Sequence, residues 1–126
     1  MSTPAFFLRT AGILGALAVG LGAFGAHALK TRLPQDLFDI FEVGVRYHFY
    51  HALALLAVAA AAPALWTSRW IPAACWAWLV GILIFSGSLY LLAVTGQRWL
   101  GAITPIGGVA FIAGWVLLVL AAARSV

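Results

Sequence analysis

The sequence predicts an all-α, polytopic membrane protein, an antiparallel four-transmembrane-helix bundle with a short interfacial helix between spans one and two. Of its 126 residues, 65% are hydrophobic and 8% are charged, whereas a soluble domain carries about 25% charged residues. The apolar residues form four runs of roughly 20 residues, the length that crosses a bilayer. Short polar or proline-containing segments separate these runs. Because the runs nearly fill the chain, residues 1–126 are expected to form a single transmembrane domain.

The first span is expected at residues 6–29, an apolar run interrupted only by Arg9 near its start. The alternative is a secretory signal peptide, with Arg9 as its positively charged region and Ala26-His27-Ala28 as the cleavage site. The run is long for the apolar part of a signal peptide, and its removal would leave three spans. We therefore expect a retained membrane helix.

A polar connection leads from span one to span two. Pro34 suits the first turn of a helix, and apolar residues alternate with acids at helical spacing as far as Glu42. This pattern predicts a short interfacial helix over residues 34–42 that runs into span two. Span two is expected at residues 43–62, because Pro63 lacks a backbone donor and clashes with the preceding turn of a helix.

Helix-start signals also precede the last two spans. Ser68 can cap the third helix, so span three is expected at residues 72–95. Thr104-Pro105 repeats the signal of a capping residue followed by proline. Span four is therefore expected at residues 105–123.

Small residues recur at helical spacing along spans one and four. Burial of apolar side chains does not drive membrane helices together, because lipid is equally apolar. Such helices associate instead by close packing through small residues. The ladders are Gly12-Ala16-Gly20 and Ala18-Gly22-Ala26 in span one, and Gly107, Ala110 and Gly114 in span four. They indicate either internal helix packing or an oligomer interface.

The polar and ionisable side chains within the spans are expected to gather in one half of the bilayer. Consecutive spans run in opposite directions, so the end of span one, the start of span two and the end of span three share a side. With a helical rise of 1.5 Å per residue, His51 and Ser88 each lie ~12 Å inside their spans. Ionisable residues at such depth face other helices or a cavity. The candidate pocket residues are His27, Tyr47, His48, His51, Ser88 and Tyr90.

Three interpretations of these histidines remain open. They are neutral imidazoles bonded to neighbouring spans, part of a pocket for a quinone or lipid, or ligands of a metal or haem. His48 and His51 have the spacing of two ligands on one helix face. No carboxylate or thiol accompanies them, and no haem-attachment motif is present. We therefore assign no metal ligand and leave the cofactor unknown.

Several function classes are disfavoured by what the sequence lacks. Glu42 is the last acidic residue, and proton-coupled transporters generally need a carboxylate inside the membrane, which disfavours a small transporter. Neither a catalytic Ser/His/Asp set nor a phosphate-binding loop is present, so no catalytic residue is assigned. The net charge of +4 comes from scattered cations, which indicate headgroup anchoring rather than nucleic-acid binding.

Four stretches, in this order, resemble the small transmembrane protein 256 family, also called domain of unknown function 423 or the YgdD-like family. The resemblance covers nearly the whole chain. It implies a four-span protein of bacterial inner membranes and weighs against a cleaved signal peptide, but it implies no reaction. The stretches are Gly22–Leu29, Tyr47–Leu53, Phe85–Tyr90 and Gly101–Val109.

Together these features predict a non-catalytic structural or accessory protein, multi-pass in the inner (cytoplasmic) membrane. Its expected partners are the lipid bilayer and either further copies of itself or a larger membrane complex. The alternative is a ligand-binding or redox-active membrane protein that uses the His/Tyr/Ser cluster in one leaflet.

Overall fold

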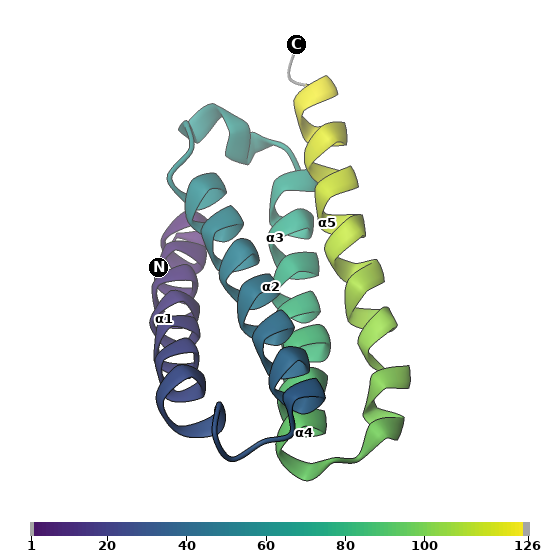
Figure 1. Ribbon diagram of the computed structural model, residues 1–126. Helices are drawn as coiled ribbons and strands as arrows, with labels where there is room; N and C mark the ends of the chain where they lie inside the picture. The colour runs from purple at the N-terminus through teal and green to yellow at the C-terminus, as the bar shows by residue number, and fades with distance from the viewer. Residues whose placement is uncertain (1, 125–126) are drawn as a thin grey trace.

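A computed structural model describes residues 2–124, and within that range it is helical with no β-strand. The all-α prediction is therefore confirmed. Figure 1 shows four helical rods joined by short connections. The first rod is α1 (Thr3–Phe24) with a π-helical turn at Gly25–Leu29, and the second is α2 (Gln35–Ala59). The third comprises α3 (Trp70–Gly81), a π-helical turn at Ile82–Ser86 and α4 (Gly87–Thr95), and the fourth is α5 (Thr104–Ala123).

The chain reverses direction at each connection between rods (Figure 1). Helix α2 packs against α1 and also against the rod formed by α3 and α4, and α5 packs chiefly against α3 and the π-helical turn that follows it. Short 3₁₀ segments at Pro63–Thr67 and Arg98–Ala102 make two of the connections. Helix α2 therefore has protein neighbours on more than one side.

The ends of the helices follow from local chemistry. The side chain of Ser2 caps α1 by accepting a hydrogen bond from the Ala5 amide at 3.3 Å. Ser68 was expected to cap the third helix, but the N-cap of α3 is Arg69; the Ser68 hydroxyl oxygen, one residue earlier, accepts from the Trp70 amide at 3.3 Å. Gly96 ends α4 in the left-handed region with φ of 71°, a conformation that favours glycine.

One sequence prediction agrees with the structure and one needs correction. The helix expected over residues 34–42 begins at Gln35 and runs without a break into the rest of α2, as far as Ala59. No proline interrupts this stretch, so nothing in the backbone separates the polar first turns from the apolar remainder. Thr104 does not cap α5, since its hydroxyl instead contacts the Leu100 carbonyl and the Ser88 hydroxyl.

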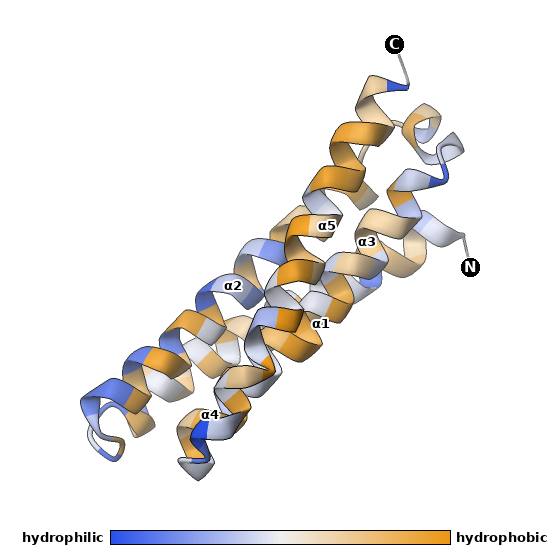
Figure 2. Cartoon of the chain, turned by 90° about the vertical axis from the view of Figure 1, so that its right-hand side faces the viewer, coloured by the Kyte–Doolittle hydropathy of each residue, from blue (hydrophilic) through white to orange (hydrophobic). Residues whose placement is uncertain are grey.

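Three segments are long and apolar enough to cross a membrane, namely Thr3–Leu29, Trp70–Thr95 and Arg98–Ala123. Helix α2 is absent from this set although its 25 residues exceed the length needed. Figure 2 shows hydrophilic residues at one end of α2 and hydrophobic residues along α5. Polar composition, not length, therefore distinguishes α2 from the other rods.

That polar end carries an ion pair. The Arg98 guanidinium donates to the Asp36 carboxylate and joins the start of α2 to the connection between α4 and α5. The Arg98 side chain beside it lowers the pKa of Asp36. Both side chains are more than half exposed, and an exposed ion pair adds little stability. The pair links the start of α2 to the connection between α4 and α5.

The glycine ladder of span four is internal packing. A Cβ added at Gly107 would collide with the backbone of Phe85, and one at Gly114 would collide with the Trp78 ring. In contrast, a Cβ at Gly12 or Gly20 of α1 would meet nothing within 4 Å. The same spacing of small residues is therefore packed against another rod in α5, whereas in α1 it faces open space.

Substituting Gly107→Ala should destabilise the fold by about 1–3 kcal/mol, because the Phe85 backbone cannot move aside as a flexible side chain would. The matched control is Gly87→Ala, where a Cβ would meet nothing within 4 Å and alanine is the better helix former. Reversible unfolding in detergent micelles measures both. Equal stability of the two variants would show that α5 does not approach the third rod this closely.

Candidate functional site

The candidate site is built on α2, which presents its polar groups to α4, α5 and the π-helical turn. His48 and His51 lie one turn apart and are both buried, with exposed fractions of 4% and 5%. Counted from Gln35, His48 is ~20 Å along α2. Both imidazoles are therefore far inside the bundle and must find partners within the protein.

His51 has both of its ring nitrogens satisfied. Its Nδ1 lies 2.8 Å from the Tyr47 carbonyl oxygen, and the indole N–H of Trp115 donates to its Nε2 at 3.1 Å. A carbonyl only accepts, so Nδ1 carries the hydrogen and Nε2 is the acceptor, which defines a neutral imidazole. The Phe111 ring stacks on His51 with centroids 3.6 Å apart and planes 8° from parallel. Hydrogen bonding and stacking thus hold this imidazole between α2 and α5.

His48 is bonded on one side only. Its Nδ1 lies 2.8 Å from the Tyr90 hydroxyl of α4. Its Nε2 is buried and has no hydrogen-bond partner among residues 2–124, although the Leu14 backbone carbonyl interacts with the imidazole. When the Tyr90 hydroxyl donates to Nδ1, the proton of the neutral ring is on Nε2, where the only interacting group in the described part of the chain is the Leu14 carbonyl of α1.

Two hydroxyl contacts complete the polar links between rods. Ser86, in the π-helical turn, donates to the Gly44 carbonyl of α2 at 2.7 Å. Ser88 lies 2.6 Å from the Thr104 hydroxyl at the start of α5 and also donates to the Phe85 carbonyl. Gly44 is tightly packed as well, because a Cβ there would lie 2.9 Å from the Tyr90 ring.

The structure brings together only part of the predicted set. Tyr47 and His51 share a hydrogen bond, and so do His48 and Tyr90. Ser88 pairs with Thr104 rather than with an imidazole. His27 is exposed in the π-helical turn after α1 and takes part in neither of these hydrogen bonds. Between residues 2 and 124, no group of three His, Cys, Asp or Glu side chains is placed to hold a metal ion.

The sequence reasoning missed Ser86 and Trp115 as partners and assigned Thr104 to a cap. A serine and an indole N–H far inside apolar runs were the signals that could have identified them, because polar groups in hydrocarbon form hydrogen bonds to neighbouring helices. Which partner each group takes depends on the rotation of one rod against another, and residue spacing within a single rod does not contain that information.

Replacing Trp115 by Phe should remove the donor to His51 and destabilise the bundle by about 1–3 kcal/mol, because the buried acceptor is left unpaired. The ¹⁵N shift of His51 Nε2 should change in the same variant. Trp99→Phe is the control, since Trp99 is 64% exposed. If both variants unfold alike and the His51 shift stays constant, the contact between Trp115 and His51 is absent in the membrane protein.

Comparison with known proteins identifies the family. A family model described as a protein of unknown function (DUF423) matches residues 21–108. The UPF0382 membrane protein YwdK of Bacillus subtilis (strain 168) is 51% identical over 116 residues, covering 89% of this chain and 94% of the relative. The UPF0382 inner membrane protein YgdD of Escherichia coli (strain K12) is 38% identical over 128 residues, covering 97% of this chain and 92% of the relative. No solved structure matches the chain.

Both relatives are named membrane proteins. The resemblance stated from the four sequence motifs is confirmed, and so is the assignment as a multi-pass helical membrane protein. The chain belongs to the DUF423 family, a family of integral membrane proteins whose biochemical role is uncharacterised.

Proposed function

We propose that the chain is a non-catalytic accessory protein that crosses the cytoplasmic membrane four times and associates with a second copy of itself. The observation that carries the proposal is the use of the buried polar groups of α2. The His51, His48 and Gly44 groups each bond to a different partner on α5, α4 or the π-helical turn. These bonds join helices and leave no triad or paired acid and base for catalysis.

The same bonds support α2 as the fourth span. A helix with polar residues crosses hydrocarbon when neighbouring helices satisfy those residues. All four Asp, Glu and Arg side chains of α2 lie in its first half, namely Asp36, Asp39, Glu42 and Arg46. From Tyr47 to Ala59 the helix contains no Asp, Glu, Lys or Arg. The inner membrane is the proposed location because the relative YgdD carries that description.

The proposed contact between copies is the open face of α1. Gly12, Ala16 and Gly20 are exposed. A groove of about 750 Å³ runs between this face and α2, and it is lined by small and aliphatic residues and by Phe49. Exposed Leu17 and Val19 stand beside the glycines. A ridge beside a groove on one face can pair with the same face of another copy about a two-fold axis, and small residues allow the close approach that membrane helices require.

Cysteine cross-linking in native membranes tests the proposal. Ala16→Cys should form a disulfide-linked dimer on mild oxidation, whereas Val119→Cys, on the exposed surface of α5, should not. The native Cys75 is fully buried and serves as an internal control. Adding Gly12→Ile to Ala16→Cys should abolish the dimer. Equal cross-linking at positions 16 and 119, or none at position 16, would contradict the proposed face.

One observation favours a second function, the binding of a quinone, lipid or metal in the imidazole cluster. His48 has a buried Nε2 without a hydrogen-bond partner among residues 2–124. A bound ligand that pairs with this nitrogen would account for a buried polar group left unsatisfied. Protein purified without chelator would then show a chromophore, a stoichiometric metal or an extractable quinone that His48→Gln loses. Its absence from both proteins would remove this function.

A further inference from the structure

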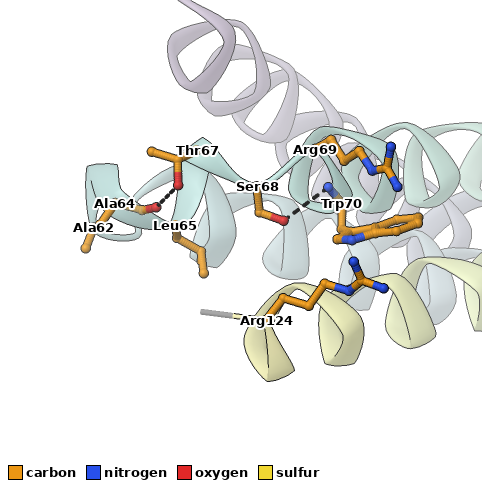
Figure 3. A pocket seen from close by; sticks show the side chains of 8 residues that line it. All are labelled: Ala62, Ala64, Leu65, Thr67, Ser68, Arg69, Trp70 and Arg124. Carbon is orange, nitrogen blue, oxygen red and sulfur yellow. Dashed lines mark hydrogen bonds between the residues drawn. The ribbon is translucent and has the colours of Figure 1, made fainter. Parts of the chain in front are cut away.

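A second site lies at the opposite end of the molecule from the acidic start of α2. An open cavity of about 720 Å³ is formed by the Pro63–Thr67 segment, the start of α3 and the end of α5 (Figure 3). Arg69, Trp70 and Arg124 line it together with the hydroxyl-bearing Thr67 and Ser68. The cavity thus combines two cations, an indole and two hydroxyls from segments far apart in the sequence.

The two arginines converge on one ring. The guanidinium carbon of Arg69 lies 4.7 Å from the Trp70 ring centroid, and that of Arg124 lies 5.7 Å from it. Figure 3 shows the two side chains reaching toward Trp70, Arg69 from just before α3 and Arg124 from just after α5. Cation–π attraction to a shared indole offsets part of the repulsion between two like charges, but it leaves their net charge uncompensated.

No acidic side chain of this chain is available to neutralise them. The three acidic residues are Asp36, Asp39 and Glu42, and all lie near the start of α2, at the other end of the rods (Figure 1). Asp36 is moreover paired with Arg98. Arg69 and Arg124 are both exposed, so an anion from outside the chain can reach them.

We propose that this cavity binds the phosphate of an anionic phospholipid headgroup. Arginine suits the site, because its planar fork donates two parallel hydrogen bonds to phosphate oxygens. Ser68 accepts from the Trp70 amide, and its hydroxyl hydrogen remains to donate. Basic pockets between membrane helices recognise anionic headgroups in this way.

Position favours a lipid over free phosphate as the source of that group. Arg124 immediately follows α5, and Trp70 begins α3, so the cavity lies at the end of two membrane-length apolar segments. Tryptophan and arginine at helix ends are typical of the level of the headgroups. Leu65 and Trp70 give the cavity an apolar wall, which suits the glycerol and upper acyl chain of a lipid and does not suit a fully hydrated anion.

Native mass spectrometry of the full chain in detergent, with equal amounts of phosphatidylglycerol and phosphatidylcholine added, tests the proposal. The wild-type protein should retain phosphatidylglycerol preferentially. The double variant Arg69→Gln with Arg124→Gln should retain about 25-fold less, or roughly five-fold less for each cation removed near a membrane surface. Phosphatidylglycerol should also raise the unfolding temperature of the wild type and not of this variant, which separates lost binding from lost folding.

The matched control is Lys30→Gln with Arg32→Gln, which removes the same two charges from exposed positions outside the cavity and should leave retention unchanged. Equal retention of the two lipids by the wild type, or equal losses in the two double variants, would overturn the proposal. Displacement of the lipid by an equal concentration of inorganic phosphate would overturn the assignment of the phosphate to a lipid.

Discussion

The hydrocarbon of a bilayer supplies no water, so a polar side chain inside it must be satisfied by the protein. In the proposed four-span arrangement this constraint applies to α2, which is the most polar rod of the four. Tyr90 pairs with His48, Trp115 pairs with His51, and Ser86 pairs with the Gly44 carbonyl. Each bond joins α2 to a different part of the bundle, so its buried polar groups have partners within the protein.

Close packing makes those bonds possible. A hydroxyl reaches a helix carbonyl only when two backbones approach, and glycine permits that approach. Gly44 accommodates the Tyr90 ring, and Gly107 allows α5 to approach the Phe85 backbone in the π-helical turn. The same turn contains Ser86, and single π-helical turns inside α-helices are frequent at functional sites. Small residues in this fold thus serve the polar contacts as well as the apolar ones.

The membrane class, the helical fold and the positions of most helix ends could be predicted from the sequence, because apolar run length and proline or glycine punctuation are local properties. The helix that leads from residue 34 into span two was also expected from local spacing. The contact of Thr104 with Ser88 was not predicted, because it joins two different rods. Of the candidate pocket residues, His48 and Tyr90 share a hydrogen bond. His27 was grouped with them only by leaflet, and its exposed side chain shows that equal depth does not bring side chains together. Contact also requires facing sides of two helices.

The most direct test is whether α2 crosses the bilayer. Single cysteines at Leu33 and Thr67, in the connections before and after α2, are labelled with a membrane-impermeant thiol reagent in intact cells and in inverted membrane vesicles. The native Cys75 is buried and should not react. If α2 crosses, one position reacts only from outside and the other only from the cytoplasmic side. Labelling of both positions from the same side would contradict the account, because the polar bonds of α2 would then form outside the hydrocarbon.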